Sequence, residues 1–80
     1  MTKDDLKEAV VAAISHYGGK ATIVQVAKHI WEKHESDLKG SGDRFYTWQY
    51  EMRWAANVLR NERRLLPVDD SPRGVWVLLR

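Results

Sequence analysis

The sequence predicts a single α+β domain in which three helices precede a C-terminal β-hairpin. Three segments carry apolar residues at intervals of three and four, which is the spacing of an amphipathic helix. The last part of the chain instead contains two short apolar runs separated by turn-forming residues. With 80 residues, 44% of them hydrophobic, the chain is long enough for one core and too short for two. We therefore expect residues 1–80 to form one domain.

The first helix is expected over residues 3–17. Thr2 suits the N-cap position, and the helix dipole favours the two aspartates of the first turn. The glycine pair at 18–19 should end the helix. One face is predicted to be buried, and it consists of Leu6, Ala9, Val10, Ala13, Ile14 and Tyr17.

A short strand over residues 20–22 and a second helix over residues 23–34 are expected next. Thr22 suits the N-cap of this helix. The predicted buried stripe consists of Ile23, Val26, Ala27, Ile30 and Trp31. Residues 35–43, "ESDLKGSGD", show no apolar periodicity and contain two glycines, which predicts a surface loop.

The third helix is expected over residues 47–62, and it has two contrasting sides. At about 100° per residue, one narrow arc should face the core, with Trp48, Met52, Ala55 and Leu59. The opposite arc contains Gln49, Tyr50, Arg53, Asn57, Arg60, Asn61 and Arg64. No acidic residue belongs to that arc, so it is a surface rich in hydrogen-bond donors.

The end of the chain predicts a β-hairpin over residues 64–79. Residues 65–68 and 75–79 are its two strands, the segment between them supplies turn residues, and Pro67 suits a strand start or an edge. The resulting order is helix, short strand, helix, loop, helix and hairpin. This is the order of a winged helix-turn-helix domain, in which three helices are joined by a short first strand and a C-terminal β-hairpin wing.

The charges of the chain point to its second half as the binding region. The net charge is only +2, but all seven arginines lie in residues 43–80, and all six lysines lie before them. Arginine presents a planar fork that suits phosphates and guanine edges, and asparagine and glutamine pair with adenine. The alternative is an ordinary solvated helix face, but such faces mix glutamate with lysine, and this arc has neither. We therefore expect double-stranded DNA as the partner.

The sequence also resembles the winged-helix domain at the N-terminus of Mrr-type restriction endonucleases. The resemblance is found in "YGGKATIVQVAKHIWEK", in "MRWAANVLRNERRLL" and in "PRGVWVL", and it spans roughly residues 4–79. It implies that the third helix enters the major groove and that the wing follows the DNA backbone. It also implies that Arg53, Asn57 and Arg60 face the groove and that Arg73 is the wing contact.

The chain departs from this family in two ways. Where related sequences often have a glycine between the third helix and the wing, this chain has Arg63 and Arg64. No residues match the nuclease part of the family, so restriction-type cleavage is not expected. For DNA binding we expect Arg64, Arg73 and Lys28 to contact phosphates, and Lys20 and Arg44 are further candidates.

The sequence predicts neither an enzyme nor a cofactor site. It contains no cysteine, its three histidines lack metal-ligand spacing, and no phosphate-binding loop or catalytic triad is present. No metal and no small-molecule substrate are expected. The longest early apolar run has six residues, too few for a membrane span, so we expect a cytoplasmic protein.

The alternative function is a winged-helix module that binds a protein, or a targeting module of a larger assembly with a fused effector domain. Tyr50 and Trp54 are typical interface anchors, and Trp54 lies beside the polar arc. We expect Trp54 to pack against the wing or the second helix. Trp31, Trp48 and Trp76 are expected to belong to the core.

Overall fold

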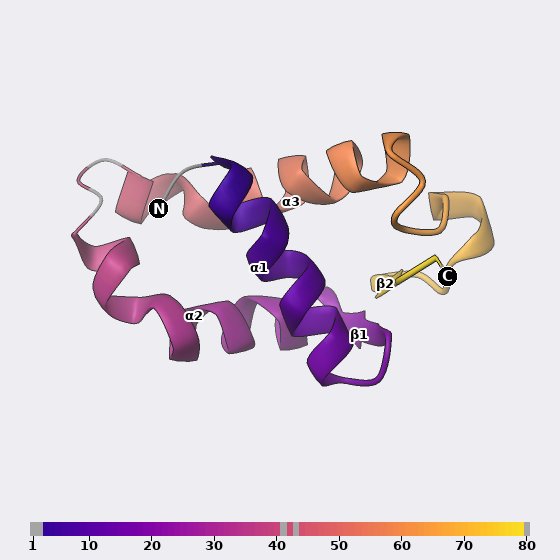
Figure 1. The fold of residues 1–80 in the computed structure, drawn as a ribbon, viewed down its shortest axis with the longest axis horizontal. Helices are drawn as coiled ribbons and strands as arrows, with labels where there is room; N and C mark the ends of the chain where they lie inside the picture. Colours follow the sequence, from indigo (N-terminus) through magenta and orange to yellow (C-terminus); the bar gives the residue numbers. More distant parts are fainter. Residues whose placement is uncertain (1–2, 41, 43, 80) are drawn as a thin grey trace.

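The computed structural model describes residues 3–40, 42 and 44–79. In this part of the chain it has the predicted α+β class with three helices, and its antiparallel sheet has two strands (Figure 1). The elements in chain order are α1 (Lys3–His16), β1 (Lys20–Thr22), α2 (Ile23–Lys39), α3 (Arg44–Asn61), the 3₁₀ helix η1 (Val68–Asp70) and β2 (Val75–Val77).

The core lies where α1 crosses the other two helices (Figure 1). The predicted seam of α3 is confirmed, because Trp48, Met52, Ala55 and Leu59 are all buried. The predicted face of α1 is also buried except for Tyr17, which is 39% exposed. That part of the prediction is wrong because Tyr17 follows the last helical residue, His16, and its ring lies beside the rings of His16 and His29. Each large side chain buried here contributes about 1.5–3 kcal/mol.

Local hydrogen bonds define the boundary between α1 and α2. The N–H of Gly19 donates to the carbonyl of Ile14, and that of Gly18 donates to Ser15, which is a Schellman motif. Gly18 has a φ of 87°, a left-handed conformation that glycine adopts without steric cost. Thr22 caps α2 as predicted, and Gln25 completes a capping box. The predicted cap of α1, Thr2, lies outside the described residues.

The predicted loop over residues 35–43 is wrong for its first five residues, which are the end of α2. His34 interrupts the helix with φ −127° and ψ 19°, and the last turn continues at a kink. Leu38 in this turn is fully buried, so hydrophobic burial stabilises a helix that propensity and periodicity do not predict. The helix α3 likewise begins at Arg44, before the predicted start, and Phe45 in its first turn packs 6.1 Å from the Trp31 ring.

The sheet is formed by β1 and β2, with Ala21 opposite Trp76 at its centre. The predicted wing is therefore only partly a hairpin. Its return strand is present, but the expected strand over 65–68 is reduced to one bridge between Leu65 and Leu78. Pro67 has no N–H to continue the ladder, and its carbonyl instead accepts a hydrogen bond from the N–H of Asp70 in η1.

Candidate functional site

The polar arc of α3 lies on the side opposite the buried seam, as the sequence predicts. Gln49, Tyr50, Arg53, Asn57 and Asn61 are exposed. Arg60 is half-buried. The rigid helix therefore presents these side chains in one row to solvent.

Three arginines meet at a hollow of about 280 Å³ between α3 and the turn before β2. Arg53 and Arg60 come from α3, and Arg73 comes from the turn. The lining described by the structure contains no acidic residue and consists of Ile23, Arg53, Asn57, Arg60, Ser71, Pro72, Arg73, Gly74, Val75 and Trp76. We call this the arginine hollow. Three like charges around one concavity favour an anionic occupant.

Backbone hydrogen bonds hold the turn that carries Arg73. The N–H of Val75 donates to the carbonyl of Pro72 at 3.1 Å, which closes the turn. Gly74 has a φ of 74°, and its carbonyl accepts a hydrogen bond from the N–H of Ile23 at the start of α2. Arg73 is thereby fixed beside α3, although it lies far from Arg53 in the sequence.

The guanidinium groups of the hollow are only partly satisfied by the described residues. Arg60 donates from one terminal nitrogen to Asn57 Oδ1 at 3.1 Å, while its buried Nε has no acceptor there. Arg53 and Arg73 form no hydrogen bond or ion pair within the described part of the chain. A ligand with oxygen acceptors therefore finds donors that are not already engaged.

Arg64, also predicted as a contact, has a different environment. Its guanidinium binds both oxygens of Glu8 on α1, at 2.9 and 3.2 Å. This hydrogen bonding lowers the pKa of Glu8 and raises that of Arg64. The nearby Glu62 accepts a hydrogen bond from Lys7 at 3.1 Å. Arg64 therefore ties the end of α3 to α1 and does not line the arginine hollow.

None of the other predicted side chains that the structure describes lines the arginine hollow. Tyr50 is 78% exposed and borders a small hollow of about 180 Å³ with Arg53, Trp54 and Asn57. Trp54 is 40% exposed, and the small hollow that it borders is formed by residues of α3 alone. Lys28 and Lys20 are exposed on α2 and β1, and the side chain of Arg44 lies outside the described residues.

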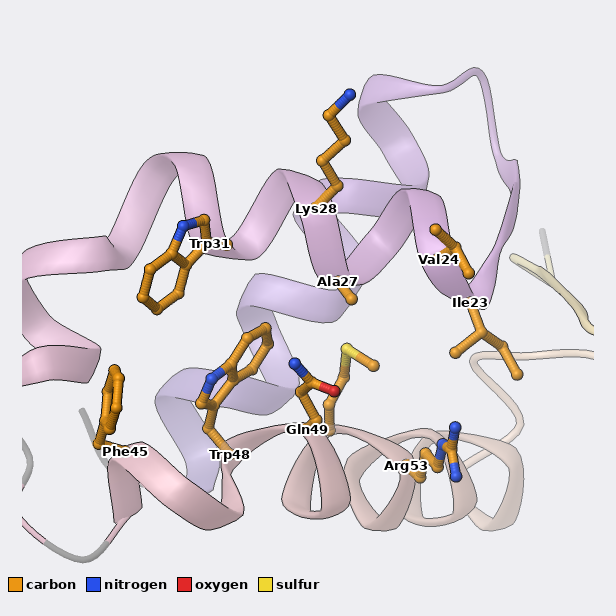
Figure 2. Close-up of a pocket in the computed structure, with 10 residues that line it drawn as sticks. Ile23, Val24, Ala27, Lys28, Trp31, Phe45, Trp48, Gln49 and Arg53 are labelled. Atoms are coloured by element: carbon orange, nitrogen blue, oxygen red, sulfur yellow. The ribbon is translucent and has the colours of Figure 1, made fainter.

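The sequence did not predict a second, larger concavity between α2 and α3. This groove has a volume of about 690 Å³, and Figure 2 shows Trp31, Phe45 and Trp48 gathered at one end. Trp31 was predicted to be core but is only half-buried, because one side faces the groove. The aromatic run "FYTW" and the spacing of Val24 and Trp31, seven residues apart on α2, are the signals that point to it.

Two other kinds of feature are absent from the described residues. They contain no group of three histidine, cysteine or acidic side chains that would hold a metal ion. No helix within them is both long and apolar enough to cross a bilayer. Comparison of the chain with protein-family models, curated proteins and solved structures found no match.

Proposed function

We propose that this chain is a winged-helix domain that binds double-stranded DNA, with α3 in the major groove and the turn over residues 71–74 on the backbone. The observation that carries the proposal is the arginine hollow, in which three guanidinium groups from two separate segments converge. The element order and the position of β2 beside α3 support the winged-helix assignment. The proposal includes the resemblance to the N-terminal domain of Mrr-type endonucleases, which was inferred from the sequence alone. We also propose a cytoplasmic location.

The chemistry of the two segments suggests a division of roles. Arg53 and Asn57 project from the exposed side of α3 and match guanine and adenine edges, respectively. Gln49 and Tyr50 extend this surface toward the start of the helix, and Asn61 extends it toward the end. Arg60, which the resemblance assigns to the groove, is half-buried, and we assign it together with Arg73 and Lys28 to phosphates. Because Asn57 already accepts a hydrogen bond from Arg60, its amide is oriented for donating outward.

The expected affinity follows from the small number of cations. Three or four phosphate contacts release three or four counterions, so log K falls with a slope of roughly −3 to −4 against log salt. Non-specific duplex DNA should then bind with a Kd on the order of 10⁻⁴–10⁻⁶ M at physiological salt.

The proposal is tested by fluorescence anisotropy with a labelled duplex at two salt concentrations. Arg53→Ala and Arg73→Ala should each weaken binding about tenfold, and Arg73→Ala should reduce the salt slope by about one. Lys33→Ala removes one exposed positive charge from α2 and leaves the arginine hollow intact, so it should bind nearly as wild type does. If both arginine variants bind like Lys33→Ala, the arginine hollow is not a DNA-binding surface.

A further inference from the structure

The groove between α2 and α3 is an open apolar surface with a rigid aromatic end. Its walls consist of Ile23, Val24, Ala27, Lys28 and Trp31 from α2 and Phe45, Trp48, Gln49, Met52 and Arg53 from α3. Figure 2 shows Trp48 and Gln49 pointing from α3 toward α2, with the ring of Trp31 beside them. The volume of about 690 Å³ is within the range of small-molecule and side-chain pockets.

Aromatic packing keeps this groove preformed. The Trp31 and Trp48 rings lie 6.2 Å apart at an interplanar angle of 15°, and Trp48 is only 5% exposed. The ammonium of Lys39 lies 5.8 Å from the Trp31 ring on the other side of the kink in α2. At the opposite end Val24 is 75% exposed, so a large aliphatic side chain is left open to water. Binding here therefore requires little ordering of the protein.

The charges around the groove select the kind of occupant. Lys28 belongs to the α2 side of the lining and extends away from α3 (Figure 2), Arg53 lies on the α3 side, and no acid belongs to the described lining. Neither cation forms a hydrogen bond or ion pair within the described residues. A nucleic-acid base fits poorly, because Trp31 and Trp48 already stack on each other and Gln49 is the one amide side chain in the lining. Apolar side chains flanked by carboxylates match both the walls and the rim.

We propose that this groove binds an acidic protein segment that inserts two or three large apolar side chains between α2 and α3. The mode is that of a peptide helix in a hydrophobic groove. This goes beyond DNA binding and uses a different surface from the exposed Trp54. Arg53 lines both the groove and the arginine hollow, and Lys28 and Gln49 in the groove are also proposed DNA contacts, so the acidic segment competes with DNA for these three side chains.

The experiment is selection of short random peptides displayed on phage against the full chain, followed by anisotropy titration of the selected peptides. Enriched sequences should carry large apolar residues at helical spacing with flanking Asp or Glu. Val24→Glu and Lys28→Glu should each weaken their binding about tenfold, because each adds repulsion at the rim. Lys33→Glu, the matched reversal on α2 outside the groove, should bind the peptides like wild type. All three positions are exposed, and thermal melts will confirm that each variant is folded.

Several results would overturn the proposal. These are no enrichment of acidic apolar peptides, enrichment of basic ones, or equal binding to Val24→Glu and Lys33→Glu. A dimer in sedimentation that Val24→Glu dissociates would assign the groove to a second copy of the chain. Single-stranded DNA that displaces the peptides and loses binding on Val24→Glu would assign it to bases. Because the selection contains no DNA, its outcome is independent of whether the domain binds a duplex.

Discussion

The arginines at the end of α3 show how neighbours in sequence acquire different roles. Arg60 donates a hydrogen bond to Asn57 beside the arginine hollow. Arg64 binds Glu8 across the interface with α1, and Arg63 adopts the backbone conformation that ends the helix. Among the described residues, Arg63 is the one non-glycine residue with a positive φ, which is 61°. The N–H of Arg64 donates to the carbonyl of Leu59 at 2.8 Å, so the helix ends in a Schellman motif without its usual glycine.

We expect Arg63→Gly to stabilise the domain. Glycine avoids the steric cost of the left-handed conformation, which stabilises the folded state by roughly 1–2 kcal/mol. The greater conformational freedom of glycine in the unfolded chain reduces this gain by about 0.5–1 kcal/mol. The free energy of unfolding measured in urea should therefore rise by about 0.5–1 kcal/mol. Asn61→Gly, in the last helical turn of α3, is the control and should lower it by roughly 0.3 kcal/mol. An unchanged or lower stability for Arg63→Gly would contradict this account of the helix end.

At the scale of elements, the sequence correctly predicted the features that depend on a strong local pattern of residues. The seam of α3 and the cap of α2 were predictable because each depends on residues close in sequence. The last turn of α2 was not predictable, because Leu38 is a single apolar residue among polar ones and forms no periodic pattern with its neighbours. The prediction of a first wing strand was also wrong. The single bridge between Leu65 and Leu78 depends on the sheet of β1 and β2 being in place.

The last turn of α2 should contribute to stability through Leu38. This side chain is fully buried, so Leu38→Ala should lower the free energy of unfolding by about 2–5 kcal/mol. Ser36→Ala changes an exposed side chain in the same turn and should alter it by less than about 0.5 kcal/mol. Both values are measured by urea unfolding. Equal, small effects of the two substitutions would mean that residues 35–39 are the surface loop that the sequence suggested.

At the scale of the whole molecule, the two candidate surfaces arise from how separate elements meet. The sequence predicted Arg53, Asn57, Arg60 and Arg73 as contacts, and the structure brings all four to one hollow. It did not predict the groove, because the apolar residues of α2 and α3 that line it were assigned to the core, and a gap between two helices depends on their separation in space. It also did not predict the partner of Arg64, because Glu8 lies 56 residues away.

The end of α1 and the middle of α2 meet in a ring cluster that should make stability depend on pH. The ring centroids of His16 and His29 lie 4.6 Å apart, and Tyr17 lies 6.2 Å from His29. Burial lowers the pKa of His29, and the nearby His16 and then Lys33 lower it further, while Glu32 acts in the opposite direction. The His29 imidazole therefore takes up a proton less readily in the folded chain than in the unfolded one.

The sign of the pH effect follows from this difference. As the pH falls through the ordinary histidine value of about 6.5, the unfolded chain binds the proton first, so stability decreases until the pH is below the folded-state pKa. The melting temperature should thus be constant above about pH 7.5 and fall toward pH 5, with a shallower fall in His29→Gln. The Glu8–Arg64 pair does not interfere, because the lowered pKa of Glu8 places its loss of stability at more acidic pH. An equal slope for His29→Gln and wild type between about pH 5 and 7 would show that another group carries the dependence. Because proton binding to His29 is linked to the contact between α1 and α2, an NMR titration of its imidazole should show the same lowered pKa.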